Sequence, residues 1–258
     1  MNLTIIVPVY NESKRIDHLI AELKKFLSTS HLLKVDFLIV DDGSTDDTKE
    51  QAIKLIDNHD NISITGYPKN SGKGAAVFFG MQAATSDYIG FMDADVATPM
   101  GHIDSVMKII KQESPGFIIG NRRATSTVYE SFIRTIASNF FNIIAHLPLR
   151  NRYPDTQAGF KFYHKNFVKE LVQLSTIKNF SFDIEHILIA EVVGIKVHSY
   201  PINDWFNGDN SKVNLVKDGI KMFKSCLKLF MARGLYKDSF QVNNSLKNKS
   251  ESSDSQAA

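Results

Sequence analysis

The sequence predicts an α/β protein with a mixed, mainly parallel sheet flanked by helices. Short apolar runs alternate with segments whose apolar residues recur at helical spacing. The runs are apolar throughout rather than at every second position, as expected for strands buried on both faces. Polar motifs follow the runs, and parallel sheets bind their ligands at the carboxyl ends of the strands.

The N-terminal half alternates expected strands and helices. Its strands are expected at 3–9, 35–40, 62–67, 88–92 and 117–120, and its helices at 12–28, 74–84 and 102–112. A further helix is expected after the second strand. Ser44 or Thr45 would be its N-cap, with Asp46 and Asp47 in the first turn.

The C-terminal half is less regular. We expect a strand at 195–202 and helices at 129–147, 164–174, 183–193 and 212–233. Residues 149–155 read as a loop. Residues 1–235 would form a single domain, followed by a polar tail at 239–258 that we expect to be disordered.

Composition excludes several classes of protein. The chain has 258 residues, 43% hydrophobic content and a net charge of +2, with no basic run that would suggest nucleic acid binding. Cys226 is the single cysteine, so no intrachain disulfide is possible. The first residues lack the basic region of a signal peptide, and no apolar stretch reaches the ~20 residues that span a bilayer. We expect a cytoplasmic protein, with any membrane contact peripheral and at the cytoplasmic face.

The motif Asp93-Ala94-Asp95 is the main chemical signal. Two carboxylates just past a buried strand suit a hard cation such as Mg²⁺ or Mn²⁺, which such sites share with substrate phosphates. Asp93 and Asp95 are therefore the metal candidates. The alternative is structural, because Asp at a strand end also forms Asx turns and helix caps.

Two loops could bind a nucleotide. Carboxylates in 41–46 could bond a base or ribose, while Gly43 permits close backbone approach. The loop 70–74 (Asn-Ser-Gly-Lys-Gly) could place Lys73 beside a diphosphate, although it is not a Walker A motif. Each loop could instead be only a turn before a helix.

The chain resembles glycosyltransferase family 2, which has the GT-A fold, over roughly residues 1–235. The resemblance lies in the motifs above and in Val7-Pro8-Val9-Tyr10-Asn11-Glu12. The second half is similar to the polyprenyl-phosphate transferases, in particular the dolichyl-phosphate β-glucosyltransferases. This similarity lies in Asn121-Arg122, Arg134, the run 155–161 and the run 182–185. The resemblance implies a nucleotide-sugar-binding half at 1–115 and an acceptor-side half at 116–235.

The resemblance also implies residue roles. The base and ribose would be held by Pro8, Tyr10, Asn11, Glu12, Asp41 and Asp42, with Gly43 and Ala94 in the same site. Asp93 and Asp95 would hold ribose, metal and diphosphate. Arg122 and Arg134 would clamp an acceptor phosphate bidentately, and Asp155 would lie near the acceptor. The two arginines could instead form structural ion pairs, and Asp155 a turn.

The acceptor decides whether a base is needed. A phosphate monoester is largely ionised at neutral pH and can attack unaided, whereas a hydroxyl needs a base, for which Asp183 or Glu185 is the candidate. Either carboxylate could instead be structural, the role that we favour for Glu185. The leading hypothesis is an inverting hexosyltransferase that moves a hexose, with glucose as the first choice, from a UDP-sugar to dolichyl or undecaprenyl phosphate. A UDP-sugar is favoured over a GDP-sugar. The alternatives are transfer to a glycan or cell-wall hydroxyl and, less favoured, a non-catalytic nucleotide-sugar-binding protein.

A basic amphipathic helix predicts membrane contact. Lysines recur along one helical face of 212–233, at Lys217, Lys221, Lys224 and Lys228. Residues 129–147 are a second candidate surface. The alternative is a core helix with a solvated lysine stripe.

Overall fold

The computed structural model describes residues 1–30, 34–56, 59–124, 153, 155–179, 181–206, 223–232, 234, 236–238 and 240. The expected helix at 129–147, Arg134, the expected tail and the first part of the expected helix at 212–233 lie outside these residues. No helix among the described residues is both long and apolar enough to cross a bilayer.

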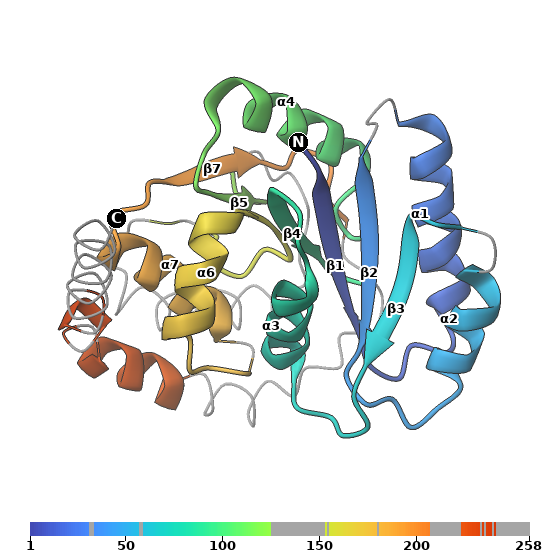
Figure 1. Ribbon diagram of the computed structural model, residues 1–258, viewed down its shortest axis with the longest axis horizontal. Helices are drawn as coiled ribbons and strands as arrows, with labels where there is room; N and C mark the ends of the chain where they lie inside the picture. Colours follow the sequence, from blue (N-terminus) through green and yellow to red (C-terminus); the bar gives the residue numbers. More distant parts are fainter. Residues whose placement is uncertain are drawn as a thin grey trace, which may run out of the picture.

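One seven-stranded sheet organises the molecule (Figure 1). Its strands are β1 (Leu3–Val9), β2 (Val35–Asp41), β3 (Ile62–Gly66), β4 (Tyr88–Met92), β5 (Phe117–Asn121), β6 (Phe160–His164) and β7 (Val197–Pro201). Their order is β3-β2-β1-β4-β6-β5-β7. Every pairing is parallel except those of β6, which runs antiparallel to β4 and β5. The predicted mixed, mainly parallel sheet is thus confirmed.

Helices cover both faces of the sheet and enclose two cores. The labelled helices are α1 (Ile16–Thr29), α2 (Thr48–Ile56), α3 (Lys73–Ala83), α4 (Gly101–Glu113), α6 (Lys165–Leu174) and α7 (Phe182–Val192). Helices α1, α2 and α4 pack on one core, and α3, α6 and α7 on the other (Figure 1). The second core also includes Cys226 and Leu229 of a helix at 223–232.

The predicted start of the helix after β2 is wrong. Helix α2 begins at Thr48, so Asp46 and Asp47 precede it and Glu50 is the acidic residue of its first turn. The physical reason is that the Asp46 carboxylate accepts hydrogen bonds from the amide and hydroxyl of Thr48. Asp46 thereby does the capping that was expected of Ser44 or Thr45.

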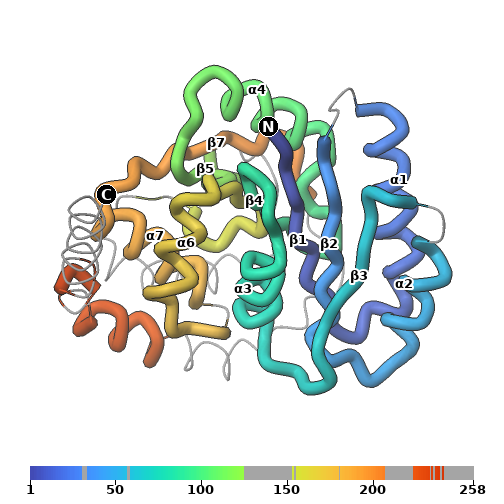
Figure 2. Tube along the Cα trace, viewed as in Figure 1, coloured from blue at the N-terminus to red at the C-terminus, as the bar shows by residue number. Residues whose placement is uncertain are grey.

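The insertion of β6 positions the site. It separates β4 from β5, with Lys161 opposite Phe91 on one side and Ile119 on the other. Because β6 is antiparallel, its first residue lies at the edge where the other strands end. The loops after β1, β2 and β3 gather at that edge, at the bottom of the view in Figure 2.

Candidate active site

The loops after β1 and β2 are joined by hydrogen bonds. The Asn11 amide donates to the Ser44 hydroxyl at 2.9 Å, and the Asn11 side-chain oxygen accepts from the Thr45 amide at 2.8 Å. The Glu12 amide donates to the Thr48 hydroxyl at 2.7 Å. These contacts hold the segment at 11–12 beside the predicted nucleotide-binding loop at 41–46.

The residues predicted to hold the base lie along this edge. Pro8 is half-buried in β1, opposite Val40 of β2, and Tyr10 is 37% exposed directly after the strand. The Glu12 carboxylate pairs with Arg15 at 2.7 Å. The structure therefore brings these positions together at one sheet edge; their contact with a nucleotide stays a prediction.

Asp41 and Asp42 have different surroundings. The Asp41 carboxylate accepts from the Ser44 amide at 3.1 Å and from its hydroxyl at 2.5 Å. The Asp42 carboxylate accepts from a loop that the sequence did not connect to it. Its donors are the Tyr67 hydroxyl at 2.7 Å, the Asn70 side chain at 3.0 Å, and the Ser71 and Gly72 amides at 2.8 and 2.9 Å.

Asp42 thus organises the 67–72 loop that leads to Lys73. Gly43 permits the close crossing of the two loops, because an added Cβ would lie 2.6 Å from the Asn70 amide nitrogen. Its φ of +67° also suits glycine. Gly43 thus serves the close approach of the 67–72 loop, and its predicted approach to a nucleotide stays a prediction.

Lys73, at the start of α3, forms an ion pair with Asp93 at the end of β4, with 2.5 Å between Nζ and Oδ1. Gly159 lies directly against this carboxylate, and an added Cβ there would overlap the Asp93 side chain. The Asp93 amide also donates to the Gly159 carbonyl at 3.1 Å. Asp93 is therefore held between the start of α3 and the loop before β6.

The chemistry of Asp93 and Asp95 fits a divalent cation. Burial opposes ionisation of Asp93, but the Lys73 ammonium holds the pKa of this carboxyl below its usual range. Burial, and then the charge of Asp93, raise the pKa of Asp95. A cation between the two carboxylates would relieve this repulsion. Among the described residues, no group of three or more His, Cys, Asp or Glu side chains could hold a metal ion. Mg²⁺ sites commonly use one or two carboxylates, with substrate phosphates and water as the other ligands. Ala94, which lies between Asp93 and Asp95 in the chain, is half-buried and packs against the core that α1 and α4 cover.

Arg122, just after β5, is bound by Asp155 in a bidentate ion pair. Its Nε and Nη2 donate to the two carboxylate oxygens at 2.8 and 3.0 Å, and its backbone amide donates to Oδ2 at 3.1 Å. The guanidinium carbon lies 5.3 Å from the centroid of the Trp205 ring. Burial opposes the charge on Asp155, but Arg122 keeps its pKa below the usual range. The structure thus joins two predicted site residues, and orients the guanidinium before any acceptor arrives.

Lys161 had no predicted role and is fully buried, next to the site. Its ammonium lies 2.8 Å from the Asp183 carboxylate and donates to the Ala158 carbonyl at 2.6 Å. Asp183 is only 3% exposed, at the first turn of α7. A sequence signal existed, because Lys161 interrupts the aromatic run of Phe160, Phe162 and Tyr163 in a strand. A lysine is almost never fully buried unless it is paired.

Glu185 has a structural role, because its carboxylate is buried and engaged by other groups of the protein. Its carboxylate accepts from the Thr176 amide and hydroxyl at 2.8 and 2.9 Å, from the Ile177 amide at 3.0 Å and from the Tyr236 hydroxyl at 2.6 Å. It therefore ties the 176–177 segment to the C-terminal part of the described chain.

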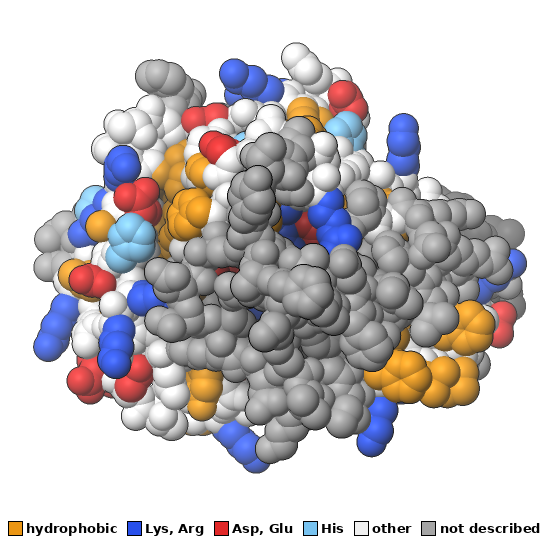
Figure 3. Space-filling model, turned by 180° about the vertical axis from the view of Figure 1, so that it is seen from behind, with side chains coloured by type: hydrophobic (Ala, Val, Ile, Leu, Met, Phe, Trp, Pro, Cys, Tyr) orange, Lys and Arg blue, Asp and Glu red, His pale blue; other side chains and the backbone are white. Residues whose placement is uncertain are grey.

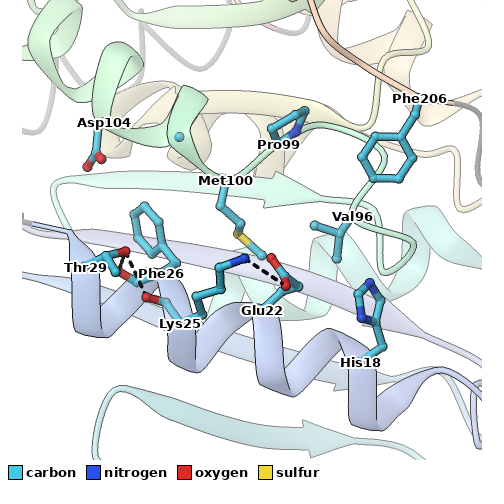
Figure 4. A pocket seen from close by; sticks show the side chains of 11 residues that line it. His18, Glu22, Lys25, Phe26, Thr29, Val96, Pro99, Met100, Asp104 and Phe206 are labelled. Carbon is cyan, nitrogen blue, oxygen red and sulfur yellow. Dashed lines mark hydrogen bonds and ion pairs between the residues drawn. The ribbon is translucent and has the colours of Figure 1, made fainter.

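A partly open cavity of about 460 Å³ lies between α1 and α4 (Figure 4). His18, Phe26, Met100 and Phe206 are among its lining residues. None of the predicted site residues lines it. It therefore lies beside, and not in, the edge that carries Asp93 and Lys73.

Comparisons with known proteins agree with this geometry. The model of Glycosyl transferase family 2 matches residues 4–172. A dolichyl-phosphate β-glucosyltransferase of Saccharomyces cerevisiae is 29% identical over 257 residues, which cover 92% of this chain and 77% of the relative. The Dictyostelium discoideum protein of the same name is 28% identical over 240 residues, which cover 88% of this chain and 73% of the relative.

A solved structure is similar to the fold of this chain. It is a crystal structure of glucosyl-3-phosphoglycerate synthase from Mycobacterium tuberculosis with Mn²⁺, UDP-glucose and phosphoglyceric acid. The TM-score is 0.65 at 15% identity, and the match covers 90% of this chain and 79% of that one. This likeness confirms the predicted GT-A-like fold.

Proposed function

Because the chain belongs to glycosyltransferase family 2, we propose that it is an inverting hexosyltransferase that moves glucose from UDP-glucose to a polyprenyl phosphate. The names of the relatives, dolichyl-phosphate β-glucosyltransferases, support the sugar and the acceptor. The structural neighbour was crystallised with Mn²⁺ and UDP-glucose, which supports the donor and the metal.

One observation carries the choice of acceptor. Both carboxylates that could act as a base for a hydroxyl acceptor are engaged within the protein. Glu185 is fully buried and accepts four hydrogen bonds, and Asp183 is 3% exposed and paired with Lys161. A phosphate acceptor needs no base, because it is already largely ionised at neutral pH.

Each remaining group has a role in this proposal. Asp93 and Asp95 would hold Mg²⁺ or Mn²⁺, which supplies charge neutralisation at the leaving diphosphate. Lys73 lies beside Asp93 and would add a further positive charge there. Arg122, oriented by Asp155, would receive the acceptor phosphate, with Arg134 as its predicted partner outside the described residues.

Attack by the acceptor phosphate oxygen on the anomeric carbon forms the new glycosyl bond as the bond to UDP breaks. A single displacement inverts an α-linked donor to a β-linked product. No proton has to leave the acceptor, so the residues around the site bind and orient rather than act as acids or bases.

Transfer to a glycan hydroxyl is the second candidate. One observation favours it: burial raises the pKa of Asp183, and a carboxylate with a raised pKa is a stronger base. The burial of that carboxylate and its ion pair with Lys161 weigh against it.

A transfer assay tests the proposal. Purified protein would receive UDP- or GDP-sugars and a short-chain polyprenyl phosphate, with Mg²⁺, Mn²⁺ or EDTA. We expect metal-dependent lipid glucosylation from UDP-glucose that Asp95→Ala and Arg122→Ala abolish. Metal-dependent hydrolysis of the donor without lipid product would contradict the phosphate acceptor and favour a hydroxyl.

Membrane contact through the helix at 223–232 is part of the proposal. Phe223, Leu227, Phe230 and Met231 are 46%, 44%, 57% and 69% exposed. Lys224 and Lys228 are exposed on the same helix, which has no acidic residue. Figure 3 shows orange side chains gathered at the lower right, where this helix lies. An apolar surface flanked by lysines suits an anionic bilayer.

Sedimentation with vesicles of an anionic phospholipid tests this contact. We expect the wild type to bind vesicles and the double variant Phe230→Ser/Met231→Ser to remain in the supernatant. Ile53→Ser removes an equally exposed apolar side chain from α2 and serves as the control. Equal binding by all three proteins would contradict a role for this helix.

A further inference from the structure

Four charged side chains form one cluster around Phe91. The ammonium groups of Lys73 and Lys161 each lie 5.3 Å from the centroid of its ring. Lys73 pairs with Asp93 and Lys161 with Asp183. The cluster contains two positive and two negative groups, so it is balanced when all four are ionised.

The two ion pairs influence each other electrostatically. Lys73 lies in the field of Asp183 as well as that of Asp93, and Lys161 lies in the field of Lys73. The arrangement of ion pairs therefore depends on the whole cluster.

Burial decides which carboxylate needs a cation more. The Asp183 side chain is 4% exposed, whereas that of Asp93 is 37% exposed and can be solvated by water. A buried, uncompensated carboxylate is far costlier than one at the surface. If Lys161 were absent, Asp183 would attract the remaining ammonium of the cluster, which is that of Lys73.

We propose that Lys161 is a positioning residue that neutralises Asp183 and so keeps the Lys73 ammonium beside Asp93, where a nucleoside diphosphate would bind. This inference rests on the proposed UDP-sugar donor. It assigns Lys161 an indirect role, because its own ammonium is fully buried and engaged by Asp183 and the Ala158 carbonyl.

The test measures binding of UDP with Mn²⁺ by titration calorimetry, together with the thermal midpoint of unfolding. Lys161→Met should weaken UDP binding by about tenfold, the effect expected from losing one charge-assisted contact to phosphate. Its thermal midpoint should also fall, because a buried charge has lost its partner. Lys161→Met/Asp183→Asn should restore both the midpoint and the affinity, since Asp183 no longer competes for Lys73.

Lys165→Met is the matched control. Lys165 lies just past the other end of β6, is 48% exposed and pairs with Asp87 at 2.7 Å. The control should bind UDP like the wild type.

Three results would overturn the proposal. Wild-type affinity in Lys161→Met would mean that Asp183 becomes neutral and never attracts Lys73. A double variant that regains the wild-type midpoint but not the affinity would mean that Lys161 acts through the 155–159 loop instead of by charge. A wild type that does not bind UDP would remove both this inference and the proposed donor. Failure of lipid transfer alone would leave the UDP titration, and this inference, standing.

Discussion

Asp42 and Asp155 are equally buried, each 3% exposed, yet they hold two regions of the site by different means. Asp42, on the proposed donor side, accepts hydrogen bonds from neutral groups of the 67–72 loop. Asp155, on the proposed acceptor side, binds the guanidinium of Arg122. Neutral donors leave a carboxylate charge in place, whereas a guanidinium cancels it. Neutral hydrogen-bond donors therefore hold the loop around Asp42, on the proposed donor side, whereas charge pairing holds Arg122 on the proposed acceptor side.

The largest expected effect comes from the point where the two regions meet. Gly159→Ala would push its Cβ into the Asp93 carboxylate. We expect the rate of transfer to fall by at least about 100-fold, because misplacement of a catalytic group by about 1 Å has effects of this size. The assay is lipid glucosylation, with folding checked by circular dichroism.

Gly101→Ala is the control for that substitution, because nothing lies within 4 Å of a Cβ added there. It should leave the transfer rate unchanged. Near-normal activity in Gly159→Ala would show that the position of Asp93 is not critical.

Next in size is the loss of the charge pair on the acceptor side. Asp155→Asn should lower the free energy of unfolding by about 2–3 kcal/mol, slightly less than for a fully buried pair because Arg122 is 33% exposed. It should also raise the KM for polyprenyl phosphate more than that for UDP-glucose. Urea denaturation and steady-state kinetics measure the two effects.

Asp87→Asn breaks the exposed pair with Lys165 and serves as a control, with a much smaller expected change because solvent screens this pair. Equal KM increases for both substrates in Asp155→Asn would contradict an acceptor-side role.

A smaller effect is expected on the donor side. In Asp42→Asn, an NH₂ group replaces one carboxylate oxygen, so some hydrogen-bond donors of the 67–72 loop lose their acceptor. We expect the free energy of unfolding to fall by about 1–2 kcal/mol. UDP affinity should fall, while the KM for the lipid phosphate stays nearly constant. Asp36→Asn, on the same strand but exposed, is the control. A selective change in the lipid KM would reverse the assignment of the two regions.

The last prediction concerns the dependence of stability on pH. Burial, and then the charge of Lys161, lower the pKa of His186 to about 3, below its usual 6.5. The unfolded chain therefore takes up a proton below about pH 6.5 that the folded protein does not, so stability falls as pH falls between 6.5 and 3.

In that window, His186 lowers the free energy of unfolding by about 1.4 kcal/mol for each pH unit that the pH falls. His186→Gln keeps a polar partner for the Tyr163 hydroxyl and should show a flatter dependence of the urea midpoint between about pH 7 and pH 5. Parallel pH profiles for the two proteins would contradict a buried neutral histidine.

The donor-side motifs were readable in the sequence because they are local. Asp41, Asp42 and Asp93 each follow an apolar run, and the end of a parallel strand is where such a sheet binds ligands. Their gathering at one edge needed only the correct assignment of strands. The partners of Asp42 were not readable, because Tyr67 and Asn70 lie 25 and 28 residues away along the chain.

The sequence by itself determined the α/β class, the strands β1–β5 and β7, and the polar residues at the ends of the N-terminal strands, because the periodicity of apolar side chains is a local property. Only the tertiary structure decided that β6 enters the sheet antiparallel between β4 and β5. That insertion places Lys161 opposite Phe91 and pairs it with Asp183, and brings Gly159 against Asp93. Pairing of this kind depends on which distant segments come into contact, and the balance of burial against charge that selects it exists only in the folded chain.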